Sequence, residues 1–156
     1  YMWGYLGNRY KNTDYIAGME IMSEPRTDVE LSQVTSMYND VCSHILSFDP
    51  NMICIIGAAK YYNLCNLNET MLLNNIPNNV IYAFNFFIPQ KYDTNATDYP
   101  VSYPGQMKCC DFEKKCLPGH CQQNKCTYNV TINKQWLSDS MDIVINNFRN
   151  KYNKPI

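Results

Sequence analysis

Apolar residues follow one another along this chain in two kinds of pattern, short continuous runs and longer stripes at helical spacing. The continuous runs cover residues 15–22, 52–57 and 79–87, and each has the length of a buried β-strand. Helical spacing of apolar residues predicts helices over residues 1–11, 28–48, 61–73 and 134–152. Helix and strand therefore alternate along most of the chain.

Two of these predicted helices have clear patterns. One face of the helix over residues 1–11 carries Trp3, Leu6 and Tyr10. The next helix has stronger signals at both ends. Thr27 and Glu30 have the spacing of a capping box, and Pro50 disfavours helical geometry in the residue before it. Its apolar residues are three or four apart throughout: Leu31, Val34, Tyr38, Val41, Ile45 and Phe48.

The alternation predicts right-handed βαβ units and a parallel sheet that is covered on both faces. Two α/β architectures fit this order, a doubly wound sheet and part of a (β/α)₈ barrel. Periodicity does not separate them. The chain has no Gly-rich phosphate loop, which disfavours a nucleotide-binding sheet.

Residues 88–133 interrupt this alternation and are too many for an ordinary connection. Five of the eight cysteines fall there: Cys109, Cys110, Cys116, Cys121 and Cys126. We predict a disulfide-rich insertion within one domain that spans residues 1–156. A zinc site is the alternative, but the chain has only two histidines and no paired CxxC units.

Composition narrows the partners and the compartment. With 46% hydrophobic and 17% charged residues, the chain is expected to be globular. A net charge of −1 and the lack of a long apolar run disfavour nucleic acid and a membrane span. The clustered cysteines favour secretion, as do three glycosylation sequons, at Asn68, Asn95 and Asn129. No metal or cofactor is expected.

One acidic residue stands where α/β proteins build ligand sites. Glu24 follows the first strand and precedes a helix, at the carboxyl edge of the predicted sheet. Pro25 is expected to hold Glu24 in extended geometry. Such an acid can protonate the leaving oxygen of a glycoside. The alternative is a solvated loop acid beside Arg26. Glu20 shares its strand parity and is expected to be a buried, hydrogen-bonded structural acid.

The stretch from Gly18 to Arg26, Gly-Met-Glu-Ile-Met-Ser-Glu-Pro-Arg, resembles the strand-four signature of family 5 glycoside hydrolases, the cellulase family. Residues 45–57 are similar to the end of helix four and strand five of that family. Residues 79–87 resemble its strand six, and residues 152–156 resemble the approach to its strand seven. The similarity keeps the family's order and leaves out the cysteine-rich segment.

The resemblance implies a partial (β/α)₈ barrel that contains about strands four to six. It also implies a secreted, retaining hydrolase of β-glycosidic bonds in cellulose or another β-glucan, with Glu24 as general acid/base. The family's nucleophile follows strand seven, so it is expected beyond Ile156, and the chain is expected to be an internal piece of a longer protein.

Three positions depart from the family pattern. Ser23 replaces an asparagine that binds the sugar, while Asn85 and Phe87 replace a histidine and a tyrosine. All three are candidate substrate-binding positions. Their departures leave open an alternative function, a noncatalytic carbohydrate-binding or degenerate barrel protein.

Overall fold

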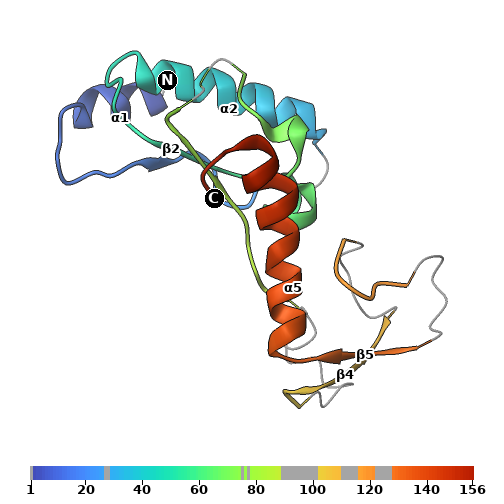
Figure 1. The fold of residues 1–156 in the computed structure, drawn as a ribbon. Coiled ribbons are helices and arrows are strands. Elements are labelled where there is room, and N and C mark those ends of the chain that lie inside the picture. Colours follow the sequence, from blue (N-terminus) through green and yellow to red (C-terminus); the bar gives the residue numbers. More distant parts are fainter. Residues whose placement is uncertain are drawn as a thin grey trace. The chain divides into compact units, whose positions relative to one another are not determined.

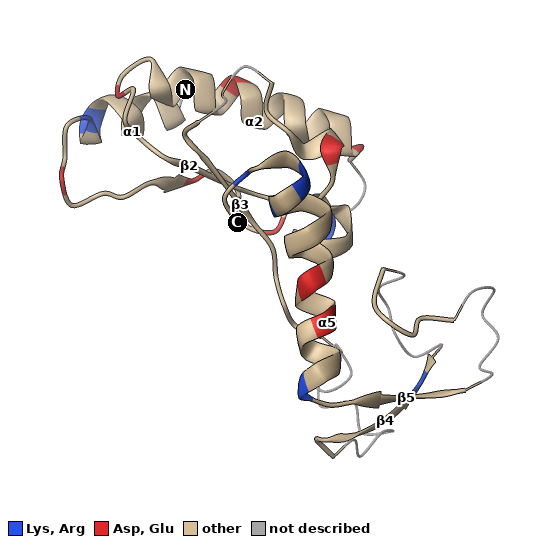
Figure 2. Cartoon of the chain, viewed as in Figure 1, with Lys and Arg blue, Asp and Glu red and all other residues tan. Residues whose placement is uncertain are grey.

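The computed structural model describes residues 2–26, 29–74, 76, 78–88, 102–109, 116–121 and 128–156 (Figure 1). They fall into two compact units. The first comprises Tyr1–Asn85 and Phe148–Ile156, and the second comprises Phe86–Asn147. Basic and acidic side chains are interspersed along both units (Figure 2). No helix in the described part of the chain is long and apolar enough to cross a bilayer.

Helix α1 (Met2–Tyr10) confirms the first predicted helix, but its buried residues are Gly4 and Gly7. A side chain at Gly4 would overlap the ring of His44, and one at Gly7 would lie 3.4 Å from the Ile45 backbone. These two glycines let α1 approach α2 closely. The closest contact of α1 with α2 is therefore made by these glycines and not by the predicted apolar face, because only residues without a side chain leave room for it.

Helix α2 (Leu31–Leu46) confirms the strongest helix prediction. Its buried positions include Val34, Tyr38 and Ile45 of the predicted stripe. The predicted capping box is wrong. Glu30 is itself the N-cap residue and its side chain makes no cap hydrogen bond, so it cannot lie three residues inside the helix. Thr27 and Asp28 lie outside the described residues.

The sheet of the first unit has three parallel strands, β1 (Met19–Glu20), β2 (Cys54–Gly57) and β3 (Val80–Ala83), in the order β1-β2-β3. Each predicted strand is confirmed, with shorter bounds. The Tyr82 N–H also donates to the Pro155 carbonyl at 3.0 Å, so the last residues of the chain run beside β3.

The core of this unit is apolar and aromatic. The Tyr82 and Phe148 rings meet edge to face with their centroids 4.9 Å apart, and the next contact, between Phe148 and Tyr152, is 5.4 Å. The largest fully buried side chains of the unit are Tyr38, Tyr82, Phe148, Ile45, Ile56 and Met71. The core thus joins side chains of residues 38–82 to Phe148, which lies near the C-terminal end of the chain.

The predicted helix over residues 61–73 is wrong. The segment begins with the irregular turn α3 (Ala59–Tyr62) and continues as two 3₁₀ turns, η1 (Leu64–Asn66) and η2 (Glu69–Met71). Residues 60–62 all have positive φ, between 55° and 63°, which no right-handed helix allows. The 3₁₀ turns are capped by the side chains of Asn63 and Asn68. Local side-chain caps thus replace the helix that spacing had predicted.

The second unit contains the antiparallel pair β4 (Gly105–Lys108) and β5 (Asn129–Ile132), followed by α5 (Lys134–Val144). The π-helical turn η5 (Ile145–Asn150) continues α5, and its residues from Phe148 on belong to the first unit. The last predicted helix is confirmed, and the two strands inside the predicted insertion were not foreseen. Asn133 caps α5 by accepting from the Trp136 N–H at 2.9 Å.

Cys65 and Cys116 are both disulfide-bonded. Cys110 and Cys126 lie outside the described residues, as does the Asn95 sequon. Within the described ranges, no group of three His, Cys, Asp or Glu side chains is arranged to hold a metal ion.

Candidate functional site

Glu24 and Asn85 meet at the carboxyl ends of the parallel strands. Met19 pairs with Cys54, which pairs with Val80, and Glu24 and Asn85 follow the ends of β1 and β3 by four and two residues. The parallel order of the strands therefore brings both residues to the same edge of the sheet. The Asn85 side-chain amide donates a hydrogen bond to Glu24 Oε1. Ligand sites of α/β proteins are built at this edge of the sheet.

The orientation of the Asn85 amide follows from a second contact. Asn85 Nδ2 also lies 3.3 Å from the Tyr61 carbonyl oxygen, which can only accept. The –NH₂ group must therefore face both Tyr61 and Glu24. In this orientation the amide donates to the Glu24 carboxylate.

The backbone of Glu24 is left-handed, with φ of 46°, so the prediction that Pro25 holds it extended is wrong. A positive φ costs about 1–2 kcal/mol in a residue with a side chain. Tertiary contacts compensate, because the buried Pro25 places its carbonyl where it accepts from the N–H groups of Lys60 (3.1 Å) and Tyr61 (3.2 Å). The turn after β2 thus sets the direction of Glu24.

Glu20, four residues before Glu24, is hydrogen-bonded as predicted, but its side chain is exposed and not buried. The Tyr62 hydroxyl lies 2.8 Å from Glu20 Oε1 and 2.6 Å from the Met22 carbonyl oxygen. Burial, and then the Glu20 contact, raise the pKa of Tyr62 above its usual range. The phenol therefore stays protonated and acts as a donor.

Ser23 and Phe87 do not join this cluster in the same way. Ser23 is exposed beside Glu24 in the chain, and no role follows from its geometry. Phe87 is 58% exposed and belongs to the second unit, whereas the cluster is built from the first unit alone.

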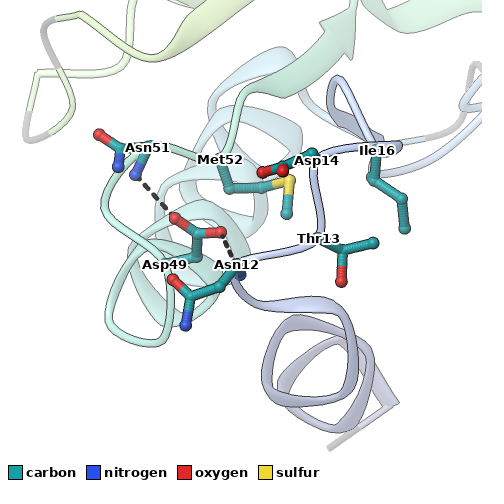
Figure 3. A pocket seen from close by; sticks show the side chains of 7 residues that line it. All are labelled: Asn12, Thr13, Asp14, Ile16, Asp49, Asn51 and Met52. Atoms are coloured by element: carbon teal, nitrogen blue, oxygen red, sulfur yellow. Dashed lines mark hydrogen bonds between the residues drawn. The ribbon is translucent and has the colours of Figure 1, made fainter.

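A pocket of about 290 Å³ lies near the opposite, amino ends of the strands (Figure 3). Asp49, in its wall, accepts hydrogen bonds from the backbone N–H groups of Asn12 (3.1 Å) and Asn51 (3.0 Å). These bonds join the segment after α1 to the segment before β2. In barrels the amino face serves stability, so this pocket is a structural feature and not the candidate site.

The hydrogen bonds that residues 60–62 make to Pro25 and Asn85 were not predicted from the sequence, because a helix was expected from residue 61 onward. One signal was present. Gly57 ends a strand, and a glycine in a strand often marks a close approach of another group. Here that group is Tyr62, since a side chain at Gly57 would overlap the Tyr62 ring.

Comparisons with known proteins agree with this arrangement. The family model described as Cellulase (glycosyl hydrolase family 5) matches residues 1–153. A search of curated proteins finds no match.

Solved structures share the fold. Cel5A of Thermotoga maritima, in complex with cellobiose, superposes with a TM-score of 0.67 at 19% identity, over 99% of this chain and 44% of that one. The cellulose synthase subunit Z of Clostridioides difficile gives a TM-score of 0.66 at 16% identity, over 98% of this chain and 44% of that one. An endoglucanase gives 0.52 at 21% identity, over 58% of this chain and 28% of that one. The chain thus spans less than half of each of these proteins.

These similarities decide between the two architectures that periodicity left open. The three parallel strands and their helices are a sector of a (β/α)₈ barrel.

Proposed function

Because this chain belongs to glycosyl hydrolase family 5, we propose that it forms part of an O-glycosyl hydrolase that cleaves β-glycosidic bonds in a polysaccharide such as cellulose or another β-glucan. Glu24 is the general acid/base of this proposal. The observation that carries it is the position of Glu24 at the carboxyl edge of the sheet, with the Asn85 amide directed at its carboxylate.

The proposed reaction has two steps. A carboxylate nucleophile attacks the anomeric carbon, the bond to the leaving oxygen breaks, and Glu24 gives its proton to that oxygen. Glu24 then takes a proton from water, whose oxygen attacks the same carbon and releases the nucleophile. The Asn85 N–H stabilises the carboxylate that Glu24 becomes between the two steps.

The register supports a location for the nucleophile. The Tyr82 N–H bonds to the Pro155 carbonyl, a pattern that pairs Tyr82 with Ile156 in a parallel ladder. A strand that continues in this register reaches the level of Asn85, whose amide donates to Glu24, three residues after Ile156. A carboxylate about 5–5.5 Å from Glu24 is required for a retaining reaction. We therefore expect the nucleophile within about one repeat of the pleat, two residues, of that level.

The substrate class is part of the same proposal. The side chain of Tyr61 is 47% exposed in the turn that binds Pro25 and Asn85. An exposed aromatic face in this turn is suited to packing against a pyranose ring. Family membership and this face together support a β-linked oligo- or polysaccharide as the substrate.

Secretion and N-glycosylation are also proposals. Disulfide bonding of Cys65 and Cys116 favours an oxidising compartment. Of the described sequons, Asn129 is exposed and Asn68 is partly buried, with its side chain accepting from the Thr70 N–H.

Glu24→Gln in the full-length protein tests the catalytic role. We expect hydrolysis of a phenyl β-cellobioside, which needs a proton on its leaving oxygen, to fall by about 10²–10⁴-fold. The first turnover on a dinitrophenyl β-cellobioside, whose leaving group departs as a stable anion, should change far less. Glu30→Gln, which alters an exposed acid at the start of α2, is the control. Near-normal hydrolysis of both substrates by Glu24→Gln would remove Glu24 from the mechanism, whereas a wild-type protein that binds the substrates without hydrolysing them would favour the noncatalytic carbohydrate-binding alternative.

A further inference from the structure

Tyr62 is a buried residue at the site that the proposed reaction does not use. Its side chain is 5% exposed, and its ring covers Gly57 so closely that no side chain fits between them. Its φ of 55° is left-handed, which costs about 1–2 kcal/mol in a residue other than glycine. A strained backbone under a buried ring persists only where surrounding contacts hold it.

Both polar ends of Tyr62 are bonded to the strands that carry the site. The hydroxyl reaches the Met22 carbonyl oxygen (2.6 Å) and Glu20 Oε1 (2.8 Å), both on the segment that leads to Glu24. The Tyr62 carbonyl accepts from the Asn85 N–H at 2.8 Å. One residue thus joins the end of β1 to the end of β3.

The same turn holds Glu24 from both sides. The Met22 carbonyl, two residues before Glu24, is bonded to the Tyr62 hydroxyl. The Pro25 carbonyl, directly after Glu24, is bonded to the N–H groups of Lys60 and Tyr61. With the chain fixed before and after it, the Glu24 carboxyl has little freedom to leave the Asn85 amide.

We propose that Tyr62 is a positioning residue for the general acid, whose hydroxyl fixes the strand end that carries Glu24 while its carbonyl fixes Asn85. The inference rests on the proposed role of Glu24. Removal of the hydroxyl frees the Met22 carbonyl and loosens Glu24 relative to the leaving oxygen. Because a displacement of about 1 Å at a reacting group can lower a rate about 10²-fold, a partial displacement should lower acid catalysis by about 10-fold.

Tyr62→Phe in the full-length protein is the test, since it removes the hydroxyl and keeps the ring over Gly57. First-turnover rates are measured on phenyl and dinitrophenyl β-cellobiosides. We expect Tyr62→Phe to slow the phenyl substrate about 10-fold through kcat, with KM nearly unchanged, and to slow the dinitrophenyl substrate less than about twofold. A purely structural role would slow both substrates equally.

Tyr38→Phe is the matched control. Tyr38 is also a buried tyrosine that donates to a backbone carbonyl, that of Gly57 at 3.1 Å, but it makes no contact with Glu24 or Asn85 that the structure shows among the described residues. This variant should keep the wild-type ratio of the two rates. An equal loss on both substrates in Tyr62→Phe, or no loss at all, would overturn the inference while leaving Glu24 in place.

Glu24→Gln, measured on the same two substrates, separates the two proposals. If Glu24→Gln slows the phenyl substrate selectively and Tyr62→Phe does not, the positioning role is wrong and the acid/base role stands. If Glu24→Gln shows no selectivity, the acid/base role fails and the positioning role fails with it.

Discussion

Gly57 and Tyr62 are predicted to be energetically coupled, because the Tyr62 ring occupies the space that any side chain at Gly57 would need. The φ of Gly57 is not in the left-handed region, so its backbone accepts alanine without strain. A Gly57→Ala substitution therefore acts through one contact. It must displace the ring, and with it the hydroxyl bonded to Glu20 and Met22.

The magnitude follows from these contacts. Overpacking of a buried side chain costs about 1–3 kcal/mol, and loss of the hydrogen bonding of the single Tyr62 O–H donor adds about 1 kcal/mol. Gly57→Ala should therefore lower the free energy of unfolding by about 3 kcal/mol. In a Tyr62→Ala background the ring is gone, and alanine is favoured over glycine in a strand by about 0.5–1 kcal/mol. There the same substitution should be neutral or stabilising.

A double-mutant cycle measures this coupling. Urea unfolding of the full-length wild type, both single variants and the double variant is followed by circular dichroism. With an m-value of about 2–3 kcal/mol/M, Gly57→Ala should lower the unfolding midpoint by about 1–1.5 M in the wild type and not in Tyr62→Ala. The coupling energy should be about 3 kcal/mol. If the two substitutions are additive, the ring is not locked over Gly57 and the positioning role of Tyr62 loses its structural basis.

Two further predictions concern the buried thiols and the sequons. A hydrogen bond with Cys54, together with burial, raises the pKa of the Cys42 thiol, so the native thiol stays protonated. The unfolded thiol ionises above about pH 8.5, so the stability that Cys42 contributes is complete below that pH and declines as the pH rises above it, by about 1.4 kcal/mol per pH unit. Iodoacetamide should label Cys42 only in urea, and a Cys42→Ala variant should show a shallower decline in unfolding free energy above pH 8.5; labelling of the native protein would contradict the buried hydrogen bond. At Asn129, the protein from its native source should carry a glycan that peptide N-glycosidase removes, and an unmodified Asn129 would count against the proposed secretory route.

The element order of the first unit could be predicted because burial leaves a local pattern. Continuous apolar runs marked β1, β2 and β3, and apolar residues at helical spacing marked α2. The position of Glu24 at a strand end followed from the same pattern. These features depend on residues close together in the sequence, so the chain displays them without a fold.

Predictions that depended on capping or on packing partners were less successful. Glu30 proved to be the N-cap residue and not an inner residue of a capping box. The pattern of polar residues does not show whether the helix begins after Thr27 or three residues later. The helix α1 was recognised, but its buried residues are Gly4 and Gly7, which carry no hydrophobic signal, whereas Tyr10 of the predicted apolar face is exposed. The strands β4 and β5 were hidden in a segment whose cysteines dominated its composition.

By itself the sequence determined the alternation of strands and helices, the strand-end position of Glu24 and the resemblance to a glycoside hydrolase family. Only the tertiary structure decided which residues meet there. Asn85 is 61 residues from Glu24, and their contact depends on the parallel order of three strands and on the turn at residues 60–62 that binds both segments. The left-handed φ of Glu24 and of residues 60–62 is likewise maintained by hydrogen bonds between segments far apart in the chain. Periodicity records how each residue is buried within its own element, whereas register and long-range hydrogen bonds are fixed only when the elements pack together.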